Sequence, residues 1–468
     1  MSLLFQRTAS YVAILLFASS LLCAQSARKA NTPLWISSTA SHPWQQMPVE
    51  IFHSSVSPTA EPIRLNDKTA YQQMDGFGSC FNELGWEALQ ALDEPAREKA
   101  LHDLFAPDGA NFTLGRMPIG ANDFSLGWYS LDEMPGDYEM KNFSVEHDRK
   151  TLIPFIHAAM KYQPQLGIWA VPWSPPTWMK TNGDYKGGAM KDDPQTLSSY
   201  ALYLSKFVQA YRNEGVQLYA IMPQNEPKYS NNNYPQAVWS AELMHLFMRD
   251  YLAPRLKQDK VPVEIWQGTM VSKTVEEFIQ PSLDDPRTNP LIKGIAYQWA
   301  GREAFLATHQ RYPDKKLMQS ETECNDGANT WQQGLGTFNE IIDDTNHYAG
   351  SYFYWNTVLN EENKSHWGWH QNSLITVDRA TRTVRYNPEY YSMKHFSAYV
   401  LPGAHRIAVG GGPFHRIVGF RNLSGNEVVE FANEGNDNVE ATIERKGIAY
   451  RLIVPAQSMN TVILPATK

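Results

Sequence analysis

Two glutamates stand where an apolar segment of the chain gives way to polar residues. Glu226 follows the apolar segment Tyr219–Pro223, and Glu321 ends the segment Lys316–Glu321. A pair of carboxyl groups can cleave a glycosidic bond, because one protonates the leaving oxygen while the other attacks the anomeric carbon or activates water. A gap of about 5–5.5 Å between them gives retention of configuration and about 6.5–9.5 Å gives inversion. Spacing along the chain does not fix this gap.

The second glutamate has a competitor two residues further along. Alternation of side chains in a strand puts Glu321 and Glu323 on the same side, so spacing does not choose between them. We favour Glu321, because it lies closer to the strand and is better immobilised. For Glu226, the following Pro227 predicts an extended backbone that would hold the carboxyl group in place. A neighbouring carboxylate and partial burial would raise the pKa of the acid, keeping it protonated near neutral pH.

Eight apolar segments of strand length run through the central part of the chain, with helical segments between several of them. Helices are expected over Thr196–Arg212 and Ala237–Leu252. Alternating strands and helices predict a parallel sheet, and eight strands predict an α/β fold of the (β/α)8 or TIM barrel type, with chemistry at the C-terminal strand ends. The predicted strands are Tyr71–Gly78, Phe112–Pro118, Leu166–Pro172, Gln217–Pro223, Val263–Gln267, Gly294–Trp299, Lys316–Glu321 and Ser351–Asn356.

The C-terminal part of the chain has a different pattern. Short alternating segments separated by Gly and Asn turns predict a small antiparallel β-sandwich. An early strand near Val49–Phe52 is expected to join it. The predicted boundaries are therefore 25–64 for a segment partly joining the sandwich, 65–398 for the barrel and 399–468 for the sandwich. The predicted sandwich strands are Arg406–Val409, Arg416–Arg421, Glu427–Ala432, Val439–Glu444, Tyr450–Val454 and Thr461–Leu464.

The first 24 residues read as a secretory signal peptide. Arg7 supplies a positive charge, and the apolar stretch Val12–Ala24 is too short to span a bilayer, so we expect a secreted or periplasmic protein without stable membrane insertion. A lipid anchor at Cys23 ranks second, because bulky Leu22 precedes it. The formal net charge of −8 argues against a nucleic-acid partner. The sequence does not say whether the two other cysteines pair, and we expect a monomer.

Several motifs, in order along the chain from about residue 65, resemble glycoside hydrolase family 30, which includes glucosylceramidases and endo-β-1,6-glucanases. The resemblance implies a barrel fused to a side β-sandwich, retention of configuration and no metal or other cofactor. The motifs are Met74–Glu83, Gly115–Ser125, Pro172–Lys180, Asn225-Glu226-Pro227, Ser320–Cys324 and Tyr354-Trp355-Asn356.

The resemblance also implies roles for single residues. It points to Glu226 as general acid/base and Glu321 as nucleophile. It gives sugar contacts to Asp123, Trp173 and Asn225, with Trp355 as an aromatic wall; we add Tyr297 at the end of the sixth strand as a further sugar-binding candidate. The plainer alternatives stay open: Asp123 as a turn residue, Arg116 as the structural partner of a carboxylate, and the two tryptophans as core filling.

Two departures from the family pattern bear on the substrate. Some members have an acidic residue where Asn82-Glu83 stands, and some have histidine where Gln298 stands; we expect both differences to affect substrate choice rather than the reaction. The aromatic stretch Ser365–Asn372 resembles the microbial glucanase branch, and we interpret it as a wall of the sugar-binding cleft. This favours β-1,6-glucan as substrate, with glucosylceramide, aryl glucosides and xylan as alternatives. A non-catalytic carbohydrate-binding protein is the alternative from another class, although such a protein would need neither carboxylate.

No other motif predicts a different chemistry. His366 and His370 are four residues apart, but the surrounding Trp and Gly residues make a metal-binding helix a poor interpretation. The run Gly76-Phe77-Gly78 lacks the third glycine of a dinucleotide-binding loop. We therefore expect neither a metal nor an organic cofactor.

Overall fold

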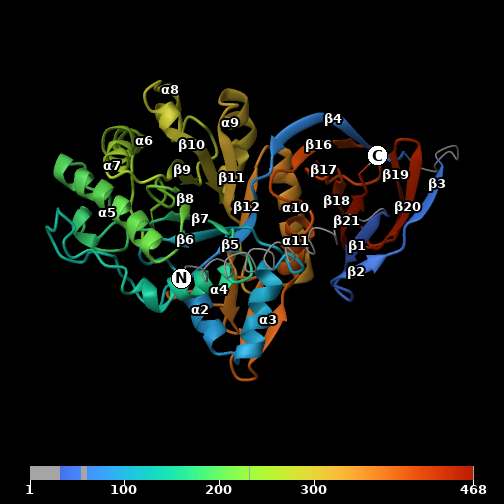
Figure 1. Ribbon diagram of the computed structural model, residues 1–468, viewed down its shortest axis with the longest axis horizontal. Helices are drawn as coiled ribbons and strands as arrows, with labels where there is room; N and C mark the ends of the chain where they lie inside the picture. Colours follow the sequence, from blue (N-terminus) through green and yellow to red (C-terminus); the bar gives the residue numbers. More distant parts are fainter. Residues whose placement is uncertain (1–31, 54–60, 231, 467–468) are drawn as a thin grey trace, which may run out of the picture.

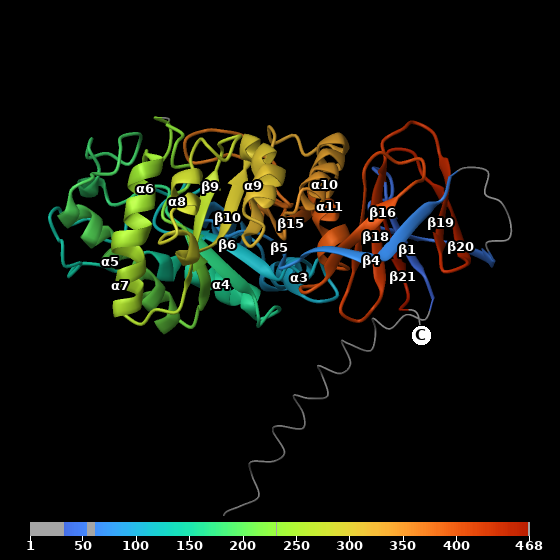
Figure 2. The same ribbon diagram turned by 90° about the horizontal axis from the view of Figure 1, so that it is seen from above.

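The computed structural model describes residues 32–53, 61–230 and 232–466, and it places two units side by side (Figures 1 and 2). One unit is a closed barrel of eight parallel strands, and the other is a ten-stranded, largely antiparallel sheet. This confirms the predicted fold class. The predicted signal peptide at residues 1–24 lies outside the described residues.

The barrel strands follow one another around the barrel in chain order, and the last strand closes against the first. Seven of them match the predicted segments to within a few residues. Their inward side chains, among them Trp169, Trp266 and Phe353, pack together, so the barrel interior is a filled core. The strands are β5 (Gly76–Cys80), β6 (Leu114–Pro118), β7 (Gly167–Val171), β8 (Leu218–Ile221), β9 (Glu264–Met270), β10 (Ile292–Gln298), β11 (Lys316–Glu321) and β12 (Ser351–Asn356).

The first predicted strand is the exception. The segment Tyr71–Gly78 divides between two sheets, because β4 (Ile63–Gln73) pairs with a sandwich strand and β5 begins only at Gly76. Gly76 has a φ of +140°, and a Cβ there would lie 2.4 Å from Thr113 Oγ1, so the turn between the sheets requires glycine. The predicted boundary at residue 65 thus falls inside a sandwich strand.

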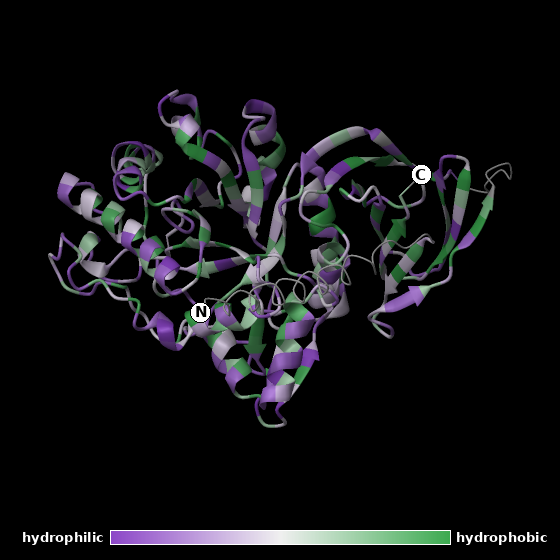
Figure 3. Ribbon diagram, viewed as in Figure 1, coloured by the Kyte–Doolittle hydropathy of each residue, from purple (hydrophilic) through white to green (hydrophobic). Residues whose placement is uncertain are grey.

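Helices surround the barrel (Figure 1). Hydrophobic and hydrophilic residues alternate along them, as expected for helices with one buried face (Figure 3). The predicted helix at 196–212 is confirmed as α5, whereas the one predicted at 237–252 begins later, where Ser240 caps α6 and accepts a hydrogen bond from Leu243 N at 3.0 Å. A π-helical turn at Met248–Leu252 then leads into α7.

The bounds of the helices are as follows. They are α2 (Glu83–Gln90), α3 (Glu94–Phe105), α4 (Leu152–Met160), α5 (Pro194–Asn213), α6 (Ala241–Phe247), α7 (Ala253–Gln258), α8 (Gln280–Asp284), α9 (Phe305–Arg311), α10 (Trp331–Asn346) and α11 (Pro388–Ser397). Short 3-10 helices are η1 (Asp148–Lys150), η2 (Thr177–Met179), η4 (Asn289–Leu291) and η5 (Trp299–Ala304).

The ten-stranded sheet is built from both ends of the described chain. Its strand order is β2-β1-β21-β18-β17-β16-β4-β19-β20-β3, and residues from both halves share one core that includes Trp35, Ile63 and Phe431. All six predicted C-terminal strands are present, and β3 pairs with β20, as expected for the early strand. The strands are β1 (Leu34–Ser38), β2 (Gln45–Met47), β3 (Glu50–His53), β4, β16 (His405–Gly410), β17 (Ile417–Arg421), β18 (Glu427–Asn433), β19 (Val439–Arg445), β20 (Ile448–Val454) and β21 (Ser458–Leu464).

A third, three-stranded sheet follows the barrel. It consists of β13 (Val358–Asn360), β14 (Ile375–Asp378) and β15 (Thr383–Tyr386). The connection between β13 and β14 contains the aromatic stretch that the sequence analysis singled out. Because β13 begins two residues after β12 ends, this connection starts at the C-terminal end of the barrel.

Candidate active site

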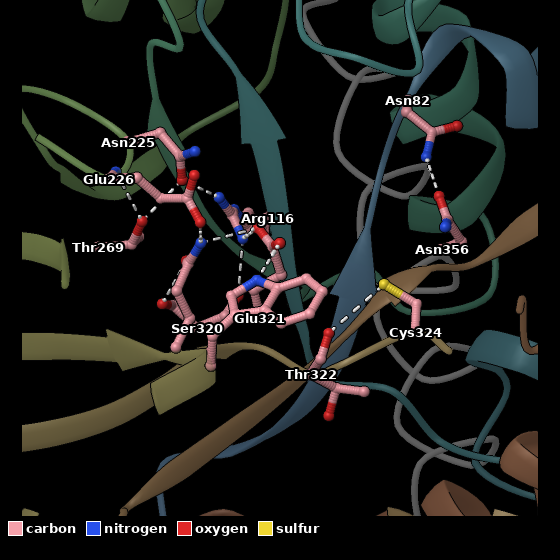
Figure 4. Close-up of polar contacts among 12 residues, drawn as sticks. Asn82, Arg116, Asn225, Glu226, Thr269, Ser320, Glu321, Thr322, Cys324 and Asn356 are labelled. Carbon is pink, nitrogen blue, oxygen red and sulfur yellow. Dashed lines mark hydrogen bonds and ion pairs between the residues drawn. The ribbon is translucent and has the colours of Figure 1, made fainter. Parts of the chain in front are cut away.

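The two predicted glutamates meet at the C-terminal end of the barrel (Figure 4). Glu226 follows β8 and Glu321 ends β11. One nitrogen, Nε2 of Gln298 at the end of β10, lies 3.1 Å from Glu226 Oε1 and 3.2 Å from Glu321 Oε2. These two carboxyl oxygens are therefore no farther apart than the sum of the two distances. This bound on one pair of oxygens lies below about 6.5 Å, the lower end of the range for the separation of the two carboxyl groups in inverting enzymes.

The backbone of Glu226 differs from the expectation. Pro227 predicted an extended conformation, but Glu226 has a φ of +45°, in the left-handed region. Its amide N–H donates to the carbonyl oxygen of Thr269 on β9 at 3.1 Å. Left-handed backbone is unfavourable for a residue with a Cβ, and such positions persist where surrounding contacts enforce them. A neighbouring strand, rather than the proline alone, thus orients this carboxyl group.

Glu226 has the protonation behaviour of an acid that works near neutral pH. Burial, followed by the negative charge of Glu321, raises the pKa of Glu226 to about 7. The Gln298 amide and the Arg116 charge act in the opposite direction. A hydrogen bond from Tyr234 Oη, 3.3 Å from Glu226 Oε2, holds the second carboxyl oxygen. The group can therefore carry a proton at neutral pH and still release it.

Glu321 is surrounded by donors. Arg116 Nη1 lies 2.5 Å from its Oε2, Trp299 Nε1 donates to its Oε1 at 2.9 Å, and Gln298 supplies the third contact. Convergent N–H donors with one cation suit an ionised carboxylate. Glu323, the competing carboxylate, is exposed to solvent beyond the strand end. The structure thus brings Glu321, and not Glu323, opposite Glu226.

Arg116 and Asn225 connect the two sides of the site. The guanidinium of Arg116 is fully buried and lies 5.1, 4.7 and 5.0 Å from the ring centroids of Trp169, Trp173 and Trp355. Its Nη2 donates to Asn225 Oδ1 at 2.7 Å, and the hydroxyl of Thr269 donates to the same oxygen at 2.6 Å.

The contacts to Asn225 fix the orientation of its amide. Because its oxygen accepts two hydrogen bonds, the amide nitrogen is the group left to face a ligand. The rings of Trp173 and Trp355 stack on each other with their centroids 5.3 Å apart. The tryptophans therefore contact both the arginine and the site, and the core-filling alternative and the binding alternative are compatible for them.

Asp123 lies close to the two glutamates and has a free carboxyl oxygen. Its Oδ1 is buried and makes no hydrogen bond within the described part of the chain. Burial and the charge of Glu321 raise the pKa of Asp123 well above its ordinary range. The backbone N–H of His366 donates to the Asp123 carbonyl at 3.0 Å, which ties this residue to the aromatic stretch. An unpartnered buried carboxyl oxygen is a natural acceptor for a ligand hydroxyl.

Four aromatic rings form a continuous row beside the carboxyl groups, which we call the aromatic row. In order they are Tyr234, Trp367, Trp369 and Trp299, with successive centroid distances of 5.9, 5.6 and 6.0 Å. The two end members donate hydrogen bonds to Glu226 and Glu321. The loop that was interpreted as a cleft wall thus supplies the middle of the row.

Comparison with known proteins fits this geometry. The model of the glycosyl hydrolase family 30 TIM-barrel domain matches residues 74–400. The chain belongs to glycosyl hydrolase family 30. It is 26% identical over 426 residues to the lysosomal acid glucosylceramidase of Mus musculus, covering 86% of this chain and 83% of that protein. It is 28% identical over 435 residues to the endo-1,6-β-D-glucanase neg1 of Aspergillus fumigatus, covering 84% and 86%.

Solved structures resemble this family 30 glycoside hydrolase over nearly its whole length. The crystal structure of SrfJ from Salmonella typhimurium superimposes with a TM-score of 0.85 at 26% identity, covering 93% of this chain and all of that one. The endo-β1,6-glucanase BT3312 gives a TM-score of 0.82 at 24% identity with the same coverage, which supports the shared fold.

One predicted site residue of this family 30 enzyme lies elsewhere. The ring of Tyr297 packs against Phe305 at a centroid distance of 5.3 Å, and its hydroxyl lies 2.6 Å from Thr308 Oγ1 on α9. Adjacent residues of a strand point to opposite faces, so Gln298 points into the site and Tyr297 points out toward the helix layer. The expected sugar contact of Tyr297 is therefore corrected to a packing role.

Gln298 and Trp299 were not predicted as contacts of the carboxyl groups. They lie at the C-terminal end of β10, the same kind of position that marks both glutamates. Tyr234 lies in the loop after β8 without any motif, so no comparable signal marked it. Cys80 and Cys324 are both buried as free thiols.

The described residues contain neither a metal-binding cluster nor a membrane-spanning helix. Within residues 32–53, 61–230 and 232–466, no group of three or more His, Cys, Asp or Glu side chains is arranged to hold a metal ion. In the same part of the chain, no helix combines the length and the apolar character that crossing a membrane requires.

Proposed function

We propose that this family 30 enzyme hydrolyses β-glucosidic bonds with retention of configuration, and that its substrate is β-1,6-glucan. The observation that carries the retaining mechanism is the single amide nitrogen of Gln298 that contacts both Glu226 and Glu321. The bound that this contact sets for one pair of carboxyl oxygens lies below about 6.5 Å, which favours retention over inversion.

In the first step, Glu226 protonates the glycosidic oxygen while Glu321 attacks the anomeric carbon. The bond to the leaving group breaks, and a covalent glycosyl ester with Glu321 forms. The amide nitrogen of Asn225 and the carboxyl oxygen of Asp123 hold hydroxyl groups of the sugar. Trp173 and Trp355 contribute aromatic surface beside the ring.

In the second step, Glu226 changes its role. Formation of the ester removes the negative charge of Glu321, which is one of the causes that raise the pKa of Glu226. The pKa of Glu226 falls, so its carboxylate can take a proton from water as that water attacks the anomeric carbon. The ester bond breaks, the sugar leaves with its original configuration, and Glu226 is again protonated.

The choice of β-1,6-glucan rests on the aromatic stretch at 365–372 and on the relatives. Proteins named as endo-1,6-β-D-glucanases from Aspergillus fumigatus and Neurospora crassa are 28% and 26% identical to this chain. A glucosylceramidase is the second candidate, favoured by the 26% identity to the Mus musculus enzyme. Aryl glucosides and xylan are further alternatives. The signal peptide predicted at residues 1–24 favours action outside the cytoplasm, and we expect the enzyme to act as a monomer.

The test compares turnover of pustulan, a β-1,6-glucan, with turnover of glucosylceramide, an aryl β-glucoside and xylan. We expect pustulan to be the best substrate, and preference for glucosylceramide would move the assignment to the second candidate. Proton NMR of the first product identifies the anomer, and an α-anomer would refute retention. Binding of glucan without turnover of any of these substrates would favour the carbohydrate-binding alternative.

A rescue experiment tests the role of Glu226 directly. We expect Glu226→Ala to lose activity on pustulan and to regain turnover of an aryl β-glucoside with azide, giving the β-glucosyl azide, because azide needs no general base. The same azide treatment should not give a β-product with Glu321→Ala, which lacks the nucleophile. An α-azide from Glu226→Ala would show that its role had been exchanged with that of Glu321.

A further inference from the structure

Gln298 lies against both carboxyl groups, although no step of the proposed reaction uses it. Its side chain is fully buried at the end of β10, and its amide nitrogen carries two N–H bonds. One points to Glu226 Oε1 at 3.1 Å and the other to Glu321 Oε2 at 3.2 Å. No other described side chain has a hydrogen bond to both carboxyl groups. The sequence predicts an effect of this residue on substrate choice, whereas its contacts bring it to the reacting groups.

The orientation of this amide is fixed from behind. The single hydroxyl proton of Ser320 is shared between two acceptors, the Tyr297 carbonyl oxygen 3.0 Å from Oγ and Gln298 Oε1 3.1 Å from Oγ. The reversed amide would place its oxygen against two carboxyl oxygens and lose both hydrogen bonds. Ser320 immediately precedes Glu321, so one short segment of β11 carries both the nucleophile and the residue that orients the amide.

The geometry points to a specific role, which rests on the proposed function. We propose that Gln298 is a positioning residue that holds the two carboxyl groups at the separation needed for retention and sets the pH range of activity. Ser320 fixes the direction of the Gln298 amide. Because an amide does not titrate, the bridge stays the same while the carboxyl groups gain and lose protons. A histidine at this position would add a third titrating group to the pair.

Several other charged or titratable groups surround the two carboxyl groups. Arg116 contacts Glu321 directly, Asp123 adds a nearby carboxyl group, and Tyr234 donates to Glu226. The buried thiols Cys80 and Cys324 also lie near Glu321 and titrate only far above neutral pH. None of these groups contacts both carboxyl groups. Donation from Gln298 favours the ionised form of Glu226, so its loss should raise the pKa of Glu226.

The first test replaces Gln298 by methionine, which has a similar volume and no donor. We expect the basic limb of the pH profile of kcat/KM, which reports loss of the Glu226 proton, to move to higher pH by roughly one unit. We expect Gln298→Glu to move this limb further, because it adds a negative charge. An unchanged basic limb in a folded Gln298→Met protein would overturn the proposal.

Ser320→Ala provides a second variant that leaves the bridge itself in place. We expect a smaller shift in the same direction, since the amide is less firmly oriented. Tyr297→Phe is the matched control, because Tyr297 is the adjacent residue but points away from the site. Its profile should coincide with that of the wild type. A shift in Tyr297→Phe as large as that in Ser320→Ala would show that β10 is merely loosened, and would overturn the role of Ser320.

A measurement without turnover separates this inference from the proposed function. Carbon NMR of protein labelled at the glutamate carboxyl carbons reports the titration of Glu226 directly, with Glu226→Gln to assign its signal. That signal should titrate at higher pH in Gln298→Met. Identical titrations would overturn the inference even if the enzyme is active. An inactive wild type with shifted titrations would refute the proposed function alone.

Discussion

Two pairs of carboxyl groups lie on opposite sides of β11, and they are held differently. The front pair is Glu226 and Glu321, and the rear pair is Glu340 and Asp344 on α10. In the rear pair one cation serves both members, because Arg302 lies 2.9 Å from Glu340 and 2.9 Å from Asp344. In the front pair, Arg116 forms an ion pair with Glu321 and none with Glu226.

The sharing of the cation distinguishes the two pairs better than their burial does. Burial raises the pKa of Glu340 just as it raises that of Glu226, so a raised pKa does not by itself identify a catalytic group. Three hydroxyl or amide groups also hold one oxygen of Glu340: Gln319 at 3.0 Å, Thr322 at 3.2 Å and Tyr352 at 2.8 Å. A cation shared by both members, with three donors on one oxygen of Glu340, makes a structural cluster, even though Asp344 Oδ2 is buried without a hydrogen-bond partner among the described residues. In the front pair Arg116 forms an ion pair with Glu321 only, so Glu226 is able to hold and release a proton.

The largest effect expected concerns the front pair. Glu321→Gln keeps the shape of the side chain but removes the nucleophilic charge, so kcat on an aryl β-glucoside should fall by roughly 10⁴-fold or more. The matched control is Glu323→Gln, two residues away and exposed, which should keep wild-type activity. The reverse pattern, with the Glu323 variant inactive and the Glu321 variant active, would make Glu323 the nucleophile.

The rear pair should respond in stability instead. Arg302→Met leaves two buried carboxyl groups without their cation, a change that typically costs about 3–5 kcal/mol. Thermal unfolding should show a large fall in Tm. Arg416→Met removes a half-exposed ion pair with Asp343 and Glu434, so we expect little change there. Equal effects of the two substitutions would contradict a structural role for the rear pair.

A smaller effect is expected on the pH dependence of stability, through Glu226 in the front pair. The folded state keeps the proton of Glu226 up to a pKa of about 7, whereas the unfolded chain loses it near its ordinary value of 4.5. The folded state thus binds more protons in this window, and stability falls as pH rises through it. Glu226→Gln removes the cost of burying an ionised carboxylate. The variant should therefore be more stable than the wild type by roughly 1–3 kcal/mol at pH 8, but not at pH 4.

Calorimetry at the two pH values measures this difference directly. We expect the Tm of Glu226→Gln to exceed that of the wild type at pH 8 and to match it at pH 4. Glu323→Gln should match the wild type at both. A stabilisation of Glu226→Gln that is equal at pH 4 and pH 8 would show that the buried charge is not its cause.

The smallest effect concerns a single donor to the front pair. Trp299→Phe keeps an aromatic ring in the row but removes the N–H that donates to Glu321 at 2.9 Å, so kcat should fall roughly tenfold. Trp367→Phe is the control, because its indole nitrogen is buried without a hydrogen-bond partner in the described residues. If both variants lose activity equally, the ring surface rather than the hydrogen bond is what matters.

The sequence predicted the barrel and both glutamates because each depends on local patterns. Buried parallel strands form continuous apolar segments, and the carboxyl groups directly follow two of them. β1 and β2 were missed, since β1 pairs with β21, more than 400 residues away in the chain. Such a pairing leaves no local signal.

The errors near the site have equally specific causes. The left-handed backbone of Glu226 depends on a hydrogen bond to Thr269, which belongs to another strand. The register between β10 and β11 shifts between Tyr297 and Gln298, so the assignment of faces at the strand end required the neighbouring strand. The donors to the carboxyl groups come from several strands, and only the closed barrel shows which of them converge.

The position of β21 in the ten-stranded sheet has a consequence for biosynthesis. β21 lies between β1 and β18 and pairs with both, yet it is translated after the whole barrel. While the ribosome makes the barrel, β1 lacks this partner, and its edge is open to wrong pairing. A chain that stops before Ser458 would leave the edges of β1 and β18 bare and remove Val462 and Leu464 from the core that Trp35 shares. Only a chain that includes β21 can cover the edges of β1 and β18 and so protect them from proteases and chaperones.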